Sequence, residues 1–281
     1  MGVLLSLLAA VGYGASDFIA GAAGRRGHPG AVAAVGQAGV IAAVGLALVI
    51  VPGSAPSAAA LWWGALSGLG TGVGVLALYW GLSVSRMSIV SPISGVLTAG
   101  IPAVTGAVIG QHLSPLGWAG VAAGIPAVAL VSAEPGDADG GTSRRDGVIA
   151  GLAAGAGFAL LFIALDRAGT ASGAWPLVPG ELIGTVLVLA WLIPARNRPR
   201  RGQWRPSVRF GLVAGVLGGA ASILYLVATG AGQLAVVAVV TALYPGVTVL
   251  MARFVFHERW GPAQVTGLMV SAFAIAAVSA G

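Results

Sequence analysis

Long apolar stretches dominate the pattern of hydrophobic and polar positions along this 281-residue chain. A bilayer core of about 30 Å needs roughly 20 apolar residues in a helix. Ten stretches approach or exceed this length, at residues 3–23, 30–51, 61–82, 89–110, 116–133, 148–166, 174–193, 208–229, 234–256 and 261–280. Strands are not expected, because no long alternation of apolar and polar residues occurs and helices satisfy their backbone polar groups internally. The pattern predicts an all-α integral membrane protein with ten transmembrane helices.

The composition strengthens this prediction and removes several kinds of chemistry. The chain is 57% hydrophobic and only 8% charged, whereas soluble domains carry about 25% charged residues. It has no Cys, and all 14 basic residues are Arg, so thiolate metal sites, a Walker A lysine and Schiff-base chemistry are excluded. His28, His112 and His257 show no metal-ligand spacing. We therefore expect no metal and no cofactor. The N-terminal stretch lacks a basic n-region and is too long for a signal peptide, so we expect it to be a retained first helix.

A polar, glycine-rich loop at residues 134–147 divides the chain almost in half. A shift of 147 residues aligns Gln111–Pro115 with Glu258–Pro262 and places Gly120 on Gly267. Because each half holds five predicted helices, an odd number, the second copy must enter the membrane upside down. Such inverted repeats are typical of secondary transporters, whose substrate site lies near the midplane between the halves. The alternative is chance similarity between apolar, glycine-rich helices.

Two short motifs resemble those of a known family. The second half contains Phe256-His257-Glu258-Arg259, an acidic-basic pair at the end of a fourth helix, although the first half has Gln111-His112 at the matching place. The opening Tyr13-Gly14-Ala15-Ser16-Asp17-Phe18 is similar to an aromatic-Gly signature in the first helix. The chain thereby resembles the EamA family of the drug/metabolite transporter superfamily over its whole length. The resemblance implies ten helices, a central cavity, transport of small organic solutes, and EamA-like five-helix repeats at 1–133 and 148–281.

The arginines predict the orientation in the membrane. When the predicted loops are assigned alternately to the two sides, 13 arginines fall on one side and only Arg167 on the other. The positive-inside rule makes the first side cytoplasmic and places both termini and the loop at 52–60 outside, although the resemblance implies both termini inside. The basic surface then faces anionic lipid headgroups rather than nucleic acid. The predicted location is the inner (plasma) membrane.

Three polar residues lie deep within predicted helices. Asp17 lies about six residues, or roughly 9 Å, from the end of the first helix, and Glu181 lies about seven residues into the seventh. An ionisable group at such depth costs about 2.5–3.5 kcal/mol on insertion scales and normally faces a cavity or a partner. Gln37 occupies a related place in the second helix. These residues indicate a shared central cavity, with structural hydrogen bonding as the alternative.

Hydroxyl-bearing residues repeat at helical spacing on several predicted helices. Spacings of three, four and seven keep side chains on one face, which either lines a wet cavity or hydrogen-bonds a neighbouring helix. Aromatic residues supply further candidate walls for a cationic or apolar solute. The predicted substrate-binding set is Tyr13, Asp17, Gln37, Tyr79, Trp80, Ser94, Thr98, Glu181, Ser222, Tyr225 and Tyr244.

These features favour a secondary transporter that exports or exchanges a small metabolite, with proton coupling through Asp17 or Glu181 as the mechanistic hypothesis. The alternatives are a channel or lipid scramblase without coupling, and a membrane-embedded enzyme. An enzyme is not expected, because the eight carboxylates are mostly scattered or in one loop. Glycines at four-residue spacing, Gly64 with Gly68 and Gly211 with Gly215, favour close packing within the bundle over a dimer face. The expected partners are a small solute and the bilayer, in a monomer or homodimer.

Overall fold

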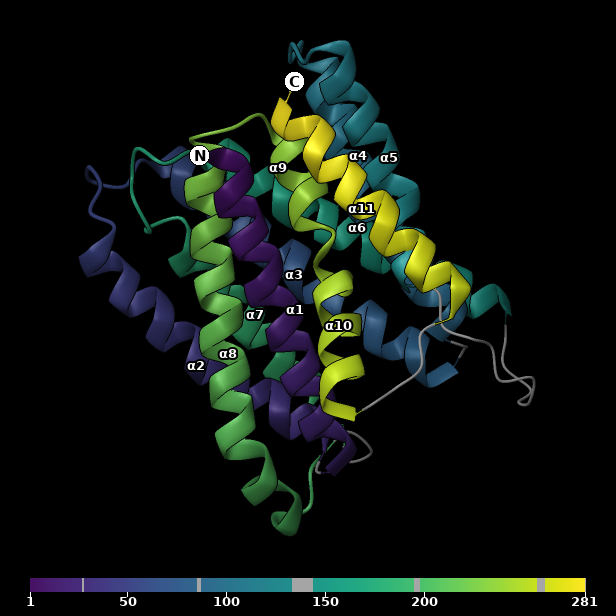
Figure 1. Ribbon diagram of the computed structural model, residues 1–281. Coiled ribbons are helices and arrows are strands. Elements are labelled where there is room, and N and C mark those ends of the chain that lie inside the picture. The colour runs from purple at the N-terminus through teal and green to yellow at the C-terminus, as the bar shows by residue number, and fades with distance from the viewer. Residues whose placement is uncertain (27, 85–86, 133–143, 195–197, 257–260, 281) are drawn as a thin grey trace.

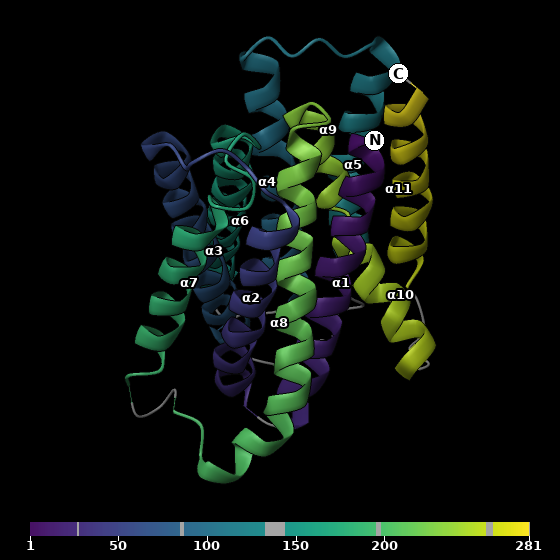
Figure 2. The same cartoon turned by 90° about the vertical axis from the view of Figure 1, so that its left-hand side faces the viewer.

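The computed structural model describes residues 1–26, 28–84, 87–132, 144–194, 198–256 and 261–280. The described part is a bundle of helices without strands (Figures 1 and 2). The helices are α1 (Gly2–Arg26), α2 (Pro29–Ile50), α3 (Ala58–Val84), α4 (Met87–Val108), α5 (Pro115–Ser132), α6 (Arg144–Ala168), α7 (Leu177–Trp191), α8 (Arg201–Thr229), α9 (Leu234–Thr241), α10 (Tyr244–Phe256) and α11 (Pro262–Ala280). Most of the linker at 134–147, together with His257, Glu258 and Arg259, lies outside the described residues.

Local sequence explains where several helices begin. His28 precedes Pro29, and its Nδ1 accepts a hydrogen bond from the Gly30 N–H at 3.1 Å. The Ser57 hydroxyl accepts from the Ala60 N–H at 3.1 Å, and the Ser114 hydroxyl accepts from the Gly117 N–H at 3.0 Å. Each cap satisfies a backbone donor that the first helical turn leaves without a partner. Proline directly after such a cap costs nothing, because its missing N–H would have had no helical acceptor.

Length and hydropathy mark most of these helices as membrane-spanning. Seven described segments are long and apolar enough to cross a bilayer, and one of them, Leu234–Val255, includes both α9 and α10. Three shorter apolar helices cover Ile93–Val108, Pro115–Val131 and Leu177–Trp191. The prediction of an all-helical, multi-pass membrane protein is confirmed.

The predicted ninth helix, residues 234–256, is interrupted. α9 ends at Thr241 and α10 begins at Tyr244, with a turn at residues 242–243. Pro245 has no N–H, so it cannot donate to the Thr241 carbonyl as an uninterrupted helix requires. A second correction concerns residues 194–207, which the sequence leaves as a connection between the predicted helices 174–193 and 208–229. Its last residues are helical, because α8 already begins at Arg201.

Helices from the two halves of the chain interleave rather than forming two lobes. α3 packs along α6, both α1 and α2 pack on α8, and α5 packs along α11. Glycines permit the closest of these approaches. A Cβ at Gly68 would overlap the backbone of Gly180, and one at Gly215 would overlap that of Gly36. The predicted role of these glycines in packing within the bundle is confirmed.

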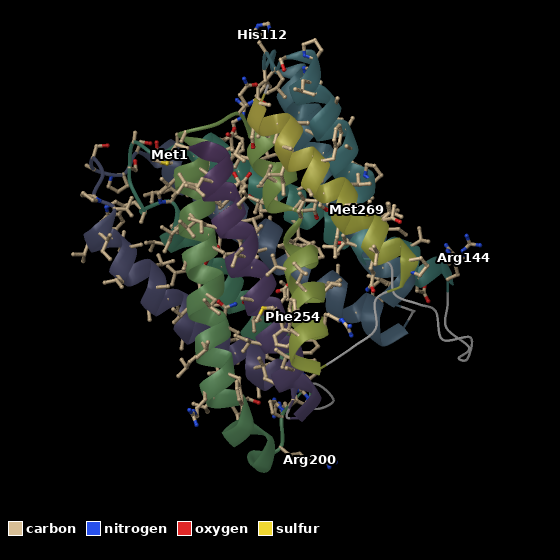
Figure 3. All side chains as sticks on the ribbon, in the orientation of Figure 1. Met1, His112, Arg144, Arg200, Phe254 and Met269 are labelled. Carbon is tan, nitrogen blue, oxygen red and sulfur yellow. The ribbon has the colours of Figure 1, made fainter. Side chains whose placement is uncertain are left out.

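Labelled residues mark the two ends of the bundle (Figure 3). Met1 and His112 lie near one end, and Arg200 lies at the other. Arg26 ends α1 at the end remote from Met1, and α8 begins with Arg201 at the end that also holds Arg200. Arg86, Arg196 and Arg259 lie outside the described residues. The described arginines at these helix ends therefore gather away from the N-terminus.

Candidate functional site

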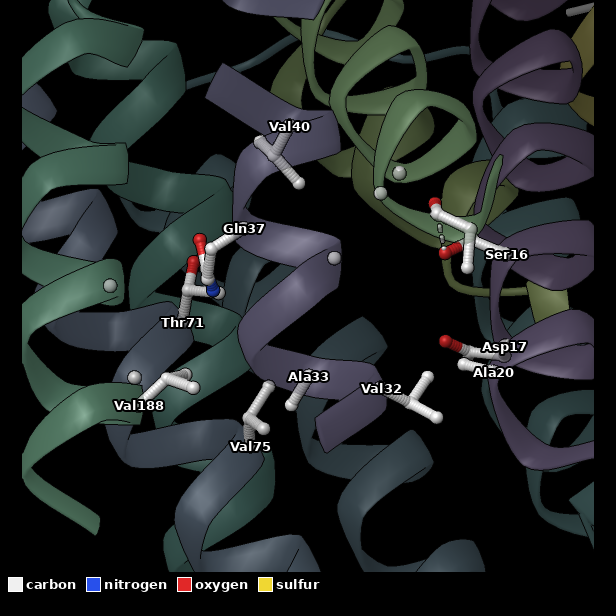
Figure 4. Close-up of a pocket in the computed structure, with 16 residues that line it drawn as sticks. Ser16, Asp17, Ala20, Val32, Ala33, Gln37, Val40, Thr71, Val75 and Val188 are labelled. Atoms are coloured by element: carbon white, nitrogen blue, oxygen red, sulfur yellow. Dashed lines mark hydrogen bonds between the residues drawn. The ribbon is translucent and has the colours of Figure 1, made fainter. Parts of the chain in front are cut away.

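A cavity of about 160 Å³ lies among five helices, α1, α2, α3, α7 and α8 (Figure 4). Its polar lining consists of Ser16 and Asp17 from α1, Gln37 from α2 and Thr71 from α3. Figure 4 shows Ser16 and Asp17 on one side of the cavity and Gln37 and Thr71 on the other. The structure thus brings together Asp17 and Gln37, which the sequence predicted to share a central cavity.

Small side chains keep this cavity open. Its lining includes the glycines at 36, 72, 184, 215 and 218. Gly215 lets α8 approach α2 at the Gly36 backbone, which closes that part of the wall tightly. At Gly184, by contrast, an added Cβ would find no atom within 4 Å. Gly215 therefore permits close packing of α8 on α2, whereas open space remains beside Gly184 on α7.

The Asp17 carboxylate has no compensating partner in the described structure. Its side chain is exposed to the cavity, and no hydrogen bond or ion pair joins it to another described residue. The lining contains no Arg or His among the described residues. The neighbouring Ser16 hydroxyl, in contrast, donates to the Ala214 carbonyl at 2.8 Å. A carboxylate placed this way attracts a proton or a cationic group, because an unpaired charge within a membrane-spanning bundle is costly.

An aromatic cluster lies one helical turn from Asp17 on the same face of α1. Tyr13 and Ser222 share a hydrogen bond between their hydroxyl oxygens at 3.0 Å. The rings of Tyr13 and Tyr244 meet edge to face with centroids 6.2 Å apart. These three predicted site residues thus come together from α1, α8 and α10, beside the cavity rather than in its lining.

Glu181 lies in a second cavity of about 150 Å³ between α2 and α7. The other lining residues are apolar, namely Ile41, Val44, Gly45, Leu48, Val178 and Leu182. No hydrogen bond or ion pair joins Glu181 to another described residue. One turn along α7 from Glu181, the Thr185 hydroxyl donates to Gln37 Oε1 at 3.2 Å. Asp17 and Glu181, which the sequence predicted to share one central cavity, therefore line two separate cavities.

Three other predicted site residues lie in helix contacts and line neither cavity. Ser94 and Thr98 are buried, with 5% and 2% exposure, and the Thr98 hydroxyl donates to the Ser94 carbonyl at 2.8 Å. Tyr225 is fully buried, its ring stacks on Phe162 at 4.4 Å, and its hydroxyl donates to the Phe162 carbonyl at 3.1 Å. These contacts match the helix-packing alternative, and neither of the two cavities described here is lined by the three residues, Ser222 or Tyr244.

The predicted set also contains two aromatic residues, Trp80 and Tyr79, and it omits three polar residues on the helices around the cavities. Trp80 is 43% exposed and lines neither cavity. The side chain of Tyr79 lies outside the described residues. The substrate-binding set predicted from the sequence lacks Ser16, Thr71 and Thr185. Their spacing could have indicated them, since Ser16 adjoins Asp17 and Thr185 follows Glu181 by one helical turn.

Comparisons with known proteins agree with this architecture. The model of the EamA-like transporter family matches residues 145–280, which confirms the family resemblance for the second half of the chain. One solved crystal structure matches with a TM-score of 0.76 at 13% identity, covering 99% of this chain and 96% of that chain. At this identity it supports the fold alone. No curated protein matches the chain. The family indicates a membrane transporter of the drug/metabolite type.

Proposed function

We propose that this chain, whose residues 145–280 belong to the EamA-like transporter family, is a secondary transporter that exports or exchanges a small metabolite across the plasma membrane. The supporting observation is the cavity around Asp17. It is enclosed by α1, α2 and α3 from the first half and by α7 and α8 from the second. A site between halves is where alternating access requires the solute to bind.

The proposal includes ten spans arranged as two inverted five-helix repeats, residues 1–133 and 148–281. α9 and α10 then form one broken span. Broken helices beside the binding site are common in secondary transporters. The interleaving of α6 and α8 with helices of the first half is in keeping with a site shared by both repeats.

The lining favours a small solute with a cationic group. At about 160 Å³, the cavity is below the roughly 300–1,000 Å³ of sites for drug-sized ligands. Asp17 offers a negative charge without a basic neighbour in the lining. A proton and a cationic solute would compete for this carboxylate, and this competition would couple the two movements.

Liposome transport tests the coupling. A stability screen of the purified protein against amino acids, nucleosides, vitamins and organic cations first selects the solute. We then expect Asp17→Asn to abolish its accumulation driven by a pH gradient while leaving exchange across the bilayer, because Asn preserves shape but not titration. Glu181→Gln is measured in parallel. If both variants still accumulate the solute against its gradient, proton coupling through these acids is wrong.

The orientation has its own test. The arginine distribution predicts that both termini and the loop at 52–60 lie outside. Single cysteines can be placed without background, because the chain has none. We expect an impermeant maleimide to label Ala55→Cys in intact cells and to label Gly202→Cys only after permeabilisation. Both positions are exposed. Labelling of position 202 in intact cells would reverse the orientation.

A further inference from the structure

The cavity around Glu181 differs from the Asp17 cavity in what its mouth faces. Ile41 of α2 and Leu182 of α7 both line it, and they are 46% and 58% exposed on the outer surface of the bundle. In a membrane-spanning chain, exposed apolar side chains on the outside of the bundle face acyl chains. The crevice between α2 and α7 therefore opens sideways into the bilayer rather than toward one aqueous end.

We infer that this crevice is a lateral binding site for an amphipathic organic cation, an amine or ammonium group carried on an apolar body. Six apolar or glycine residues provide the surface for the body. Glu181 provides the only charge in the lining and has no hydrogen bond or ion pair with another described residue. A neutral solute would leave this carboxylate unpaired, whereas an ammonium group would form a charge-assisted hydrogen bond with it.

The position of Glu181 connects the crevice with the transport pathway. One turn along α7, the Thr185 hydroxyl donates to Gln37 Oε1 at 3.2 Å. Gln37 also lines the Asp17 cavity. This hydrogen bond thus joins the helix that carries Glu181 to a residue of the Asp17 cavity, and such bonds contribute only about 0.6 kcal/mol on average within membranes. The inference rests on the proposed function in one respect: the crevice supplies the solute that the Asp17 cavity then transports.

The test is equilibrium binding of radiolabelled octylammonium to the purified chain in phosphatidylcholine nanodiscs, with empty nanodiscs subtracted. We expect Glu181→Gln to weaken binding at least tenfold, since it removes the charge and keeps the shape. Asp166→Asn, which removes a carboxylate at the end of α6, serves as the matched control and should bind normally. Unlabelled octanol should not compete, because it lacks the ammonium group.

Filling the crevice gives an independent measurement. A Cβ at Gly45 would meet no atom within 4 Å, so Gly45→Leu can extend into the crevice without shifting the helices. We expect it to weaken octylammonium binding at least tenfold. Gly21→Leu, at another helical glycine with open space around its Cβ, is the control and should bind as the unmodified chain does.

Three outcomes would overturn the inference. Normal binding by both Glu181→Gln and Gly45→Leu would place the ligand elsewhere. Equal loss in the control variants would indicate general damage. Displacement of octylammonium when phosphatidylethanolamine replaces phosphatidylcholine would make a lipid amine the occupant instead of a free solute. Binding is measured without transport, so a chain that binds octylammonium at Glu181 but moves no solute would contradict only the proposed function.

Discussion

The bundle contains two regions that look alike in sequence but differ in packing. Around α1, α2, α3 and α7, polar residues border open space. Where α4 packs on α6, the hydroxyl residues Ser94 and Thr98 are buried in contacts. The difference follows from whether each polar side chain finds a hydrogen-bond partner within its own helix. A Thr hydroxyl donates to a carbonyl of its own helix, as Thr98 does to Ser94. A carboxylate such as Asp17 can only accept, and the carbonyls of its own helix offer it no donor.

The largest expected effect is on the packed region. A Cβ at Gly155 of α6 would lie 2.7 Å from the Ser94 carbonyl oxygen and 2.6 Å from the Leu97 Cβ. Gly155→Leu should therefore lower the free energy of unfolding by about 3 kcal/mol, because overpacked cores must shift their backbones. Unfolding in mixed micelles measures it. A loss below about 1 kcal/mol would mean that this region is as loose as the region around Asp17.

Gly184→Leu is the matched substitution in the open region, and it should affect transport rather than stability. Gly184 is buried and helical like Gly155, but its Cβ would meet no atom within 4 Å and would point into open space. Gly184→Leu should retain stability, since leucine favours helix over glycine by up to about 1 kcal/mol. It should reduce the initial rate of solute transport at least tenfold by occupying the cavity. Normal transport would show that the solute does not pass this point.

Tyr225 tests whether a predicted site residue is structural. Its hydroxyl donates to the Phe162 carbonyl at 3.1 Å within a fully buried contact. Tyr225→Phe keeps the stacked ring and removes one hydrogen bond, so the free energy of unfolding should fall by about 1 kcal/mol. Equilibrium unfolding provides the measurement. Unchanged stability together with lost transport would return Tyr225 to the substrate-binding set.

The smallest effect is expected at Thr98. Its hydroxyl bonds only within α4, and valine has nearly the same shape. Thr98→Val should therefore change the free energy of unfolding by about 0.5 kcal/mol or less. The same unfolding assay detects it, with Gly155→Leu as the destabilised reference. A large loss of transport at unchanged stability would mean that the Thr98 hydroxyl reaches the solute.

Sequence alone predicted the parts of the molecule that follow from simple physics. Long apolar runs predicted helices with small errors at their ends, and the depth of Asp17 predicted a polar cavity, which the structure contains. The hydroxyl stripes were ambiguous, because a spacing of four residues suits an intrahelical bond and a cavity wall equally well. The bond between Thr185 and Gln37 joins residues 148 positions apart. No local pattern reveals such a pairing, since it depends on which helices pack together.

The interruption between α9 and α10 has a mechanical consequence. All eight residues of α9 are buried, whereas Phe254 and Val255 near the end of α10 are 73% and 57% exposed. Without a continuous ladder of backbone bonds, tilting of α10 is not transmitted rigidly to α9. The Thr248 hydroxyl donates to the Gly14 carbonyl at 3.1 Å, only three residues before Asp17. α10 is therefore joined to α9 through the turn at residues 242–243 and to α1, the helix that carries Asp17, through the Thr248 hydrogen bond.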